Sequence, residues 1–266
     1  MVTIVDALGQ QEPEVERGRC AFCNYRGKLT KEHVWPERFN NIIKVTGITG
    51  YERGDMASGP TTWEAEAFST TVRIDCGDCN HHRLRQIEDE AIIPYIAPML
   101  YGQSAAALHL TAQRKIAAFA LRMFAVSQYT HRRARPIPRH HREYLVTHRS
   151  APPLAEVWLW RCVPETNDAI LPDIYCASLR VSGKGERFSG RVNAYHGILR
   201  IAHLVVEIAS RTDGLAFPLL PAAPGAYLRI WPMHDFNRAF IWPPKRALTE
   251  AAYQARVRAC AESVTV

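Results

Sequence analysis

The stretch TTVRIDCGDCNHHRLRQIEDEAIIP, residues 70–94, contains three local patterns in succession. Polar and apolar residues alternate over 70–75, which is typical of a strand. Cys76 and Cys79 form a C-x-x-C pair. Leu84, Ile87 and Ala91 then recur at helical spacing up to Pro94, where we expect the helix to end. The sequence therefore predicts a helix that starts directly from a cysteine knuckle at the end of a strand.

The other knuckle, CAFC at residues 20–23, comes first along the chain, and 52 residues separate it from the second knuckle at 76–79. Two thiolates at this spacing can hold one ion from a tight turn, and two such pairs complete a closed tetrahedral site. The chain has 7 cysteines, and we expect a reducing, cytoplasmic location because no basic and apolar leader opens the sequence. We therefore predict a structural zinc ion bound by Cys20, Cys23, Cys76 and Cys79.

Residues 30–36, TKEHVWP, follow the first knuckle and contain an adjacent glutamate and histidine. We expect Glu32 and His33 on a strand, and the zinc would fold the helix that starts after Cys79 across it. A carboxylate from each side, Glu32 with Asp89 or its competitor Glu88, would then hold a divalent cation beside the imidazole. Hard oxygen ligands favour Mg²⁺ or Mn²⁺ for this second ion.

Four elements in order, CAFC, EHVWP (residues 32–36), CGDCN (76–80) and IEDEA (87–91), resemble the HNH or ββα-metal endonucleases in their zinc-knuckle form. The resemblance covers about residues 18–100 and implies a ββα-metal core that hydrolyses phosphodiesters. It implies that His33 is the general base, that Glu32 ligates the catalytic cation, and that Asn80 orients the loop carrying the base. The family's last metal ligand, commonly His or Asn, falls about nine residues after the asparagine, and counting from Asn80 reaches Asp89.

The net charge is +7, with 27 arginines against 6 lysines, which favours an anionic partner such as nucleic acid. We expect DNA, with RNA as the open alternative, and we expect Lys31, Arg83 and Arg85 to contact phosphates. The rival interpretation is a zinc-stabilised nucleic-acid-binding module that does not cleave.

We expect an α+β protein in four parts: an N-terminal arm at 1–17, the HNH nuclease domain at 18–100, a helical segment at 101–150, and a mostly β C-terminal region at 151–266. A helix is predicted over 104–129 with Ser104 as its N-cap. The basic residues of 131–150 either contact phosphates or form a linker. His196 and His203 are interpreted as structural. No apolar run is long enough to cross a bilayer, and neither the role of the C-terminal region nor the oligomeric state follows from the sequence.

Overall fold

The computed structural model describes residues 18–43, 48–53, 61–66, 68–102, 106–130, 136–165, 172–179, 194–212, 225–233 and 239–262. The expected N-terminal arm lies outside them. Within these ranges the chain is α+β, as expected. One hydrophobic cluster includes buried residues from Cys20 to Trp242, so the knuckle region and the C-terminal strands share a core.

The N-terminal part contains β1 (Leu29–His33), α1 (Phe39–Ile42), β2 (Ile48–Arg53), β3 (Thr61–Glu66) and β4 (Thr71–Cys76). Strand β1 pairs antiparallel with β4, and β2 pairs with β3 as a separate hairpin. A helical run then starts at the second knuckle: a π-helical turn (Cys79–Leu84), α2 (Arg85–Ala91), a second π-helical turn (Ile92–Ile96) and α3 (Ala97–Leu100). The predicted strand and the predicted helix start are both confirmed.

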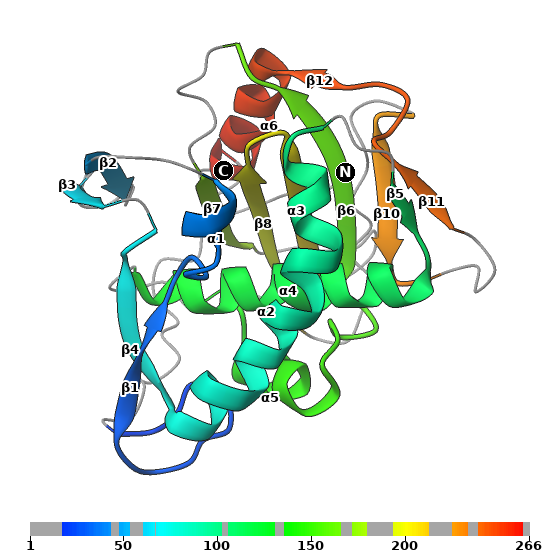
Figure 1. Ribbon diagram of the computed structural model, residues 1–266. Coiled ribbons are helices and arrows are strands. Elements are labelled where there is room, and N and C mark those ends of the chain that lie inside the picture. The colour runs from blue at the N-terminus through cyan, green and yellow to red at the C-terminus, as the bar shows by residue number, and fades with distance from the viewer. Residues whose placement is uncertain are drawn as a thin grey trace, which may run out of the picture.

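The predicted end of this helix at Pro94 is wrong, because the helical run continues to Leu100 (Figure 1). Proline cannot donate a backbone hydrogen bond, and its ring crowds the carbonyl four residues earlier in an α-helix. Pro94 lies within the second π-helical turn, where the hydrogen bonds span one residue more. The wider turn therefore carries the helix past the proline.

Helix α4 (Leu110–Ser127) is central to the fold, and every residue from Ile116 to Ser127 is buried. It begins later than predicted; Ser104 lies outside the described residues, and Ala106–Leu108 forms β5, which pairs with β11 (Phe240–Trp242). A 3-10 turn (Gln128–Thr130) follows α4, and α5 (Arg139–His148) takes up part of the basic segment. Two basic residues of α5, His141 and Arg142, are buried.

The C-terminal region is mostly β, as predicted. It contains β6 (Glu156–Val163), β7 (Asp173–Leu179), β8 (Ala194–Ile201), β9 (Leu204–Arg211), β10 (Tyr227–Trp231) and β12 (Leu248–Thr249), and it ends in α6 (Glu250–Glu262). The strand order is β10-β6-β9-β8-β7, with β12 parallel to β6.

Helices cover both faces of this sheet, and β8 and β9 are buried along their whole length. Gly197 of β8 faces Phe124 of α4, whereas the side chain of its neighbour His196 contacts Glu207, a carboxylate that Arg256 of α6 also contacts. Because successive residues of a strand point to opposite faces, α4 and α6 pack on opposite sides of the sheet (Figure 1).

His196 of β8 and His203 of the turn between β8 and β9 have structural contacts, as interpreted from the sequence. The Nε2 atom of His196 lies 2.6 Å from Oε1 of Glu207, a fully buried carboxylate that Arg256 of α6 also contacts at 2.8 Å. The Nδ1 atom of His203 lies 3.0 Å from the carbonyl oxygen of Cys162. His196 therefore helps to fix α6 on the sheet.

The close packing of α4 on β8 leads to a stability prediction. A Cβ atom added to Gly197 would lie 2.7 Å from two ring carbons of Phe124. Gly197→Ala should therefore lower the free energy of unfolding by about 1–3 kcal/mol, as overpacking does, measured by urea denaturation. Adding Phe124→Leu should recover part of the loss, since the ring edge is removed. Equal stability of wild type and Gly197→Ala would show that the packing of Phe124 on Gly197 leaves room for a Cβ atom.

Candidate functional site

The four cysteines of the two knuckles come together. Their Sγ atoms all lie within 4.8 Å of one another, and the Sγ atoms of Cys23 and Cys76 are 3.6 Å apart. Tetrahedral zinc with Zn–S bonds of about 2.3 Å separates its sulfurs by about 3.8 Å. Three of the four residues are buried. The cluster is therefore compatible with the predicted zinc site.

The local backbone explains how each pair reaches the cluster. The first knuckle is a tight turn in which the Cys20 amide donates to the Tyr25 carbonyl at 2.9 Å, and Asn24 has a φ of 61°. In the second knuckle, Cys76 ends β4 and Cys79 begins the helical run. Since Leu29 at the start of β1 pairs with Cys76, the hairpin places the second pair beside the first.

The crowded thiols cannot all ionise without a cation. A hydrogen bond from Cys79 lowers the pKa of Cys20 to about 4. Burial raises the pKa of Cys23 to about 11, and the bond to Cys20 raises the pKa of Cys79 well above its usual range. One thiolate is thus stabilised at the expense of its neighbours. A dication bound at the centre would allow further thiols to ionise.

Asn80 connects the start of the helix to β1. Its Nδ2 atom donates to the carbonyl oxygen of Lys31 at 2.7 Å and to Oγ1 of Thr30 at 3.0 Å. These contacts lie at a register shift of the β1–β4 pair, between Thr30 and Lys31. Asn80 therefore fixes the strand just before Glu32 and His33.

A buried arginine, Arg122 of α4, fixes the same strand from the other side. Its Nη2 atom donates to the carboxylate of Glu32 and, at 2.8 Å, to the carbonyl oxygen of His33. Its Nη1 atom donates to the carbonyl oxygen of Val34 at 2.9 Å. The side chains of Arg122 and Glu32 are only 1% and 6% exposed. The end of β1 is thus held by a residue 90 positions later in the chain.

Glu88 also reaches this guanidinium. Its Oε1 atom lies 2.6 Å from Nη2 of Arg122, although the contact lacks hydrogen-bond geometry. Burial raises the pKa of Glu88 to about 7, against the opposing effect of Arg122. Glu32 and Glu88 therefore both contact the guanidinium of Arg122. This is the pair of carboxylates predicted from the sequence as the alternative to Glu32 with Asp89.

Asp75 adds a third carboxylate near this group. It is fully buried, and its Oδ2 atom has no hydrogen-bond partner among the described residues. Burial and the nearby charge of Glu32 raise its pKa to about 8. Asp75, Glu32 and Glu88 thus all interact electrostatically with the single guanidinium of Arg122.

Asp89 lies elsewhere, in a contact with Arg38 of the segment before α1 and 4.0 Å from Arg85. Its side chain is 40% exposed. Since no contact with Glu32 is recorded for it among the described residues, the geometry favours Glu88 over Asp89 as the acidic partner of Glu32.

The remaining candidate residues lie around the same strand and helix. His33 is half-buried at the end of β1, opposite Thr71 of β4. Lys31, Arg83 and Arg85 are exposed, and Arg83 forms an ion pair with Asp78 at 2.8 Å. The three cations therefore stand on the solvent side of the strand and helix that carry Glu32, His33 and Asn80.

Sequence reasoning missed two residues of this group, Arg122 and Asp75. Arg122 interrupts the otherwise apolar run FALRMFAV (residues 119–126) of a core helix. A charged residue is rarely buried unless it is paired, so this position was a signal for a buried ion pair. Asp75, which directly precedes Cys76 in a strand, carried no comparable signal.

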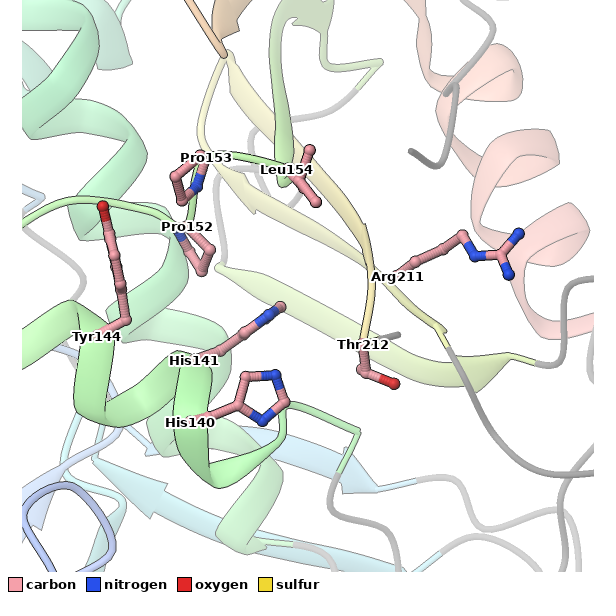
Figure 2. A pocket seen from close by; sticks show the side chains of 8 residues that line it. All are labelled: His140, His141, Tyr144, Pro152, Pro153, Leu154, Arg211 and Thr212. Atoms are coloured by element: carbon pink, nitrogen blue, oxygen red, sulfur yellow. The ribbon is translucent and has the colours of Figure 1, made fainter. Parts of the chain in front are cut away.

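A separate cavity of about 250 Å³ lies between α5 and the sheet, lined by His140, His141, Tyr144, Pro152, Pro153, Leu154, Arg211 and Thr212. Figure 2 shows the rings of His140 and His141 at its floor, with the Arg211 side chain pointing away. The Nδ1 atom of His141 lies 3.0 Å from the Tyr195 hydroxyl. None of the candidate nuclease residues lines this cavity.

The buried His141 leads to a pH prediction. Burial, with a smaller effect of the neighbouring His140, lowers the pKa of His141 to about 4. Below its unfolded pKa of about 6.5 the unfolded chain binds the proton first, so stability is lost as the pH falls from 6.5 to 4, by about 3 kcal/mol. In His141→Gln, urea denaturation should show a smaller decrease in the free energy of unfolding between pH 6.5 and pH 4. His148→Gln, an exposed histidine of the same helix, serves as the control, and an unchanged acid slope in His141→Gln would contradict the assignment.

No protein-family model, curated protein or solved structure matches the chain. Among the helices of the described ranges, none has both the length and the apolar character that a membrane crossing requires.

Proposed function

We propose that the chain is a metal-dependent HNH endonuclease that hydrolyses phosphodiester bonds in nucleic acid, with DNA as the expected substrate. The observation that carries the proposal is the cysteine cluster, which joins the two knuckles. It brings the β1–β4 hairpin, with Glu32 and His33, against the helical run that contains Asn80 and Glu88. This strand, strand and helix order supports what the motif resemblance implies.

As part of the proposal, Glu32 and Glu88 would hold a second, catalytic cation. Glu32 and Glu88 converge on Arg122, and carboxylate oxygens are the ligands that Mg²⁺ or Mn²⁺ prefers. When bound, such an ion would offset the charge that develops on the phosphate and on the leaving oxygen. A zinc ion held by four thiolates has no open coordination position, so its proposed role is to hold the fold.

The other roles belong to side chains of the strand and helix. His33 would take the proton from the attacking water, as a general base does. Asn80 holds the carbonyl of Lys31 and so orients the strand that carries the base. The exposed cations Lys31, Arg83 and Arg85 would contact the phosphates of the nucleic acid, consistent with the net charge of +7.

A zinc-stabilised nucleic-acid-binding module without cleavage is the second candidate. The observation that favours it is Arg122, which pairs with both Glu32 and Glu88. A site whose carboxylates are already close to the positive charge of an arginine has less need of a catalytic cation. The exposed cations beside the knuckles would serve binding equally well.

Nicking of supercoiled plasmid at low salt tests the proposal. The wild-type protein should convert the plasmid to open circles with Mg²⁺ or Mn²⁺ and should stop when EDTA is added. Duplex DNA, single strands and RNA digested in parallel identify the substrate class. Tight binding of nucleic acid without cleavage of any of these substrates would replace the nuclease with the binding module.

A further inference from the structure

Arg122 is the feature that the motif resemblance does not explain. It comes from α4, outside residues 18–100, and its side chain is fully buried. Its guanidinium contacts the carboxylates of Glu32 and Glu88 and the backbone carbonyls of His33 and Val34. Four groups of the candidate site thus share one cation from another part of the chain.

The geometry of these contacts indicates what the arginine does. The planar fork of an arginine donates in fixed directions, so two donors can fix two successive backbone carbonyls. The carbonyls of His33 and Val34 lie 2.8 and 2.9 Å from the guanidinium nitrogens. The backbone that presents the imidazole of His33 is therefore fixed from the core side, while Asn80 fixes it from the helix side through Lys31.

Because Arg122 is buried, it is not a loosely held counter-ion of Glu32 and Glu88. A buried guanidinium that also binds two backbone carbonyls cannot leave without exposing unsatisfied groups, which is costly. It is therefore expected to stay in place when Glu32 accepts another cation through its remaining oxygen lone pairs. Groups that orient a metal ligand in this way are required for full activity in many metal sites.

We propose that Arg122 is a positioning residue of the nuclease site, holding Glu32, Glu88 and the backbone of His33 in place, so that the catalytic unit includes α4. The inference rests on the proposed function for its effect on cleavage. The structural part of the inference, that Arg122 holds the end of β1 in place, does not require the protein to be a nuclease.

The test compares wild type with Arg122→Lys, Arg122→Met and the control Arg114→Met, an exposed arginine of the same helix that donates to the His148 carbonyl at 2.8 Å. Amide hydrogen exchange is measured on peptides that cover residues 29–36, and zinc content is measured on each protein. Arg122→Lys keeps the charge but loses the fork, so it should fold even where Arg122→Met does not.

The expected result is faster exchange at residues 29–36 in Arg122→Lys, with zinc content and the exchange of β8 and β9 unchanged. If the wild type nicks plasmid, kcat of Arg122→Lys should fall by about 10–100-fold with KM nearly constant, whereas Arg114→Met should match wild type. Unchanged exchange at 29–36 would overturn the proposal whether or not the protein cleaves DNA. Tighter Mn²⁺ binding with faster cleavage in an Arg122 variant would also overturn it, because Arg122 would then be a competitor of the cation.

Discussion

His33→Ala should lower the rate of plasmid nicking by about 10²–10⁴-fold, the range that a general base contributes to proton transfer. His33 lies at the end of β1, where Asn80 and Arg122 fix the preceding and following backbone. Its removal takes away the proposed proton acceptor and leaves the cysteine cluster untouched. Nucleic-acid binding should therefore be unchanged, measured by fluorescence anisotropy of a labelled duplex in Ca²⁺ or EDTA.

The matched control is His82→Ala, an exposed histidine on the first turns of the neighbouring helix. It should nick plasmid at the wild-type rate. Equal activity of His33→Ala and wild type would remove His33 from the mechanism, and the nuclease would then need another base. Loss of binding together with loss of cleavage would assign His33 to nucleic-acid recognition.

Cys79→Ser should prevent binding of the predicted zinc and unfold the hairpin and helix that the cluster joins. Cys79 is fully buried and begins the helical run, so its thiolate links the helix to both knuckles. Structural zinc sites contribute about 10–16 kcal/mol of apparent binding free energy in small zinc-dependent folds. Elemental analysis should give one zinc per wild-type chain and much less in the variant. Circular dichroism should show a lower melting temperature, and a strong chelator should reproduce it in the wild type.

Cys162→Ala is the control, because Cys162 is equally buried but lies in β6, away from the cluster. It should keep its zinc and lose little stability. A purified wild-type protein that contains no zinc and is unaffected by the chelator would contradict the metal assignment. The closeness of the four sulfurs would then be explained by packing alone.

Much of this site could be predicted because it rests on local patterns. The alternation over 70–75 and the apolar spacing after Cys79 are properties of neighbouring residues, and both correspond to β4 and to the helical run. The two C-x-x-C pairs also carried a long-range prediction, since two such pairs can complete one closed tetrahedral site around a shared ion. For that reason the contact between residues 20–23 and 76–79 could be inferred across 52 intervening positions.

The acidic partner of Glu32 could not be decided in the same way. Glu88 and Asp89 are adjacent, and the choice depends on the rotation of the helix about its axis. The π-helical turn between Cys79 and Leu84 adds to that rotation, and no sequence pattern indicates such a turn. Arg122 could not be assigned for a different reason. Its partners lie far away in the sequence, about 90 positions earlier for Glu32 and 34 for Glu88, and an isolated arginine specifies neither of them.

Asn80 and Arg122, the two residues that fix the end of β1, are synthesised at different times. Asn80 is present as soon as the second knuckle has been synthesised, whereas Arg122 follows 42 residues later. A ribosome-bound or truncated chain that ends before α4 would have both knuckles but no guanidinium between Glu32 and Glu88. If the site works as proposed, incomplete chains would be poor nucleases, and a cell would be protected from cleavage by fragments of its own product.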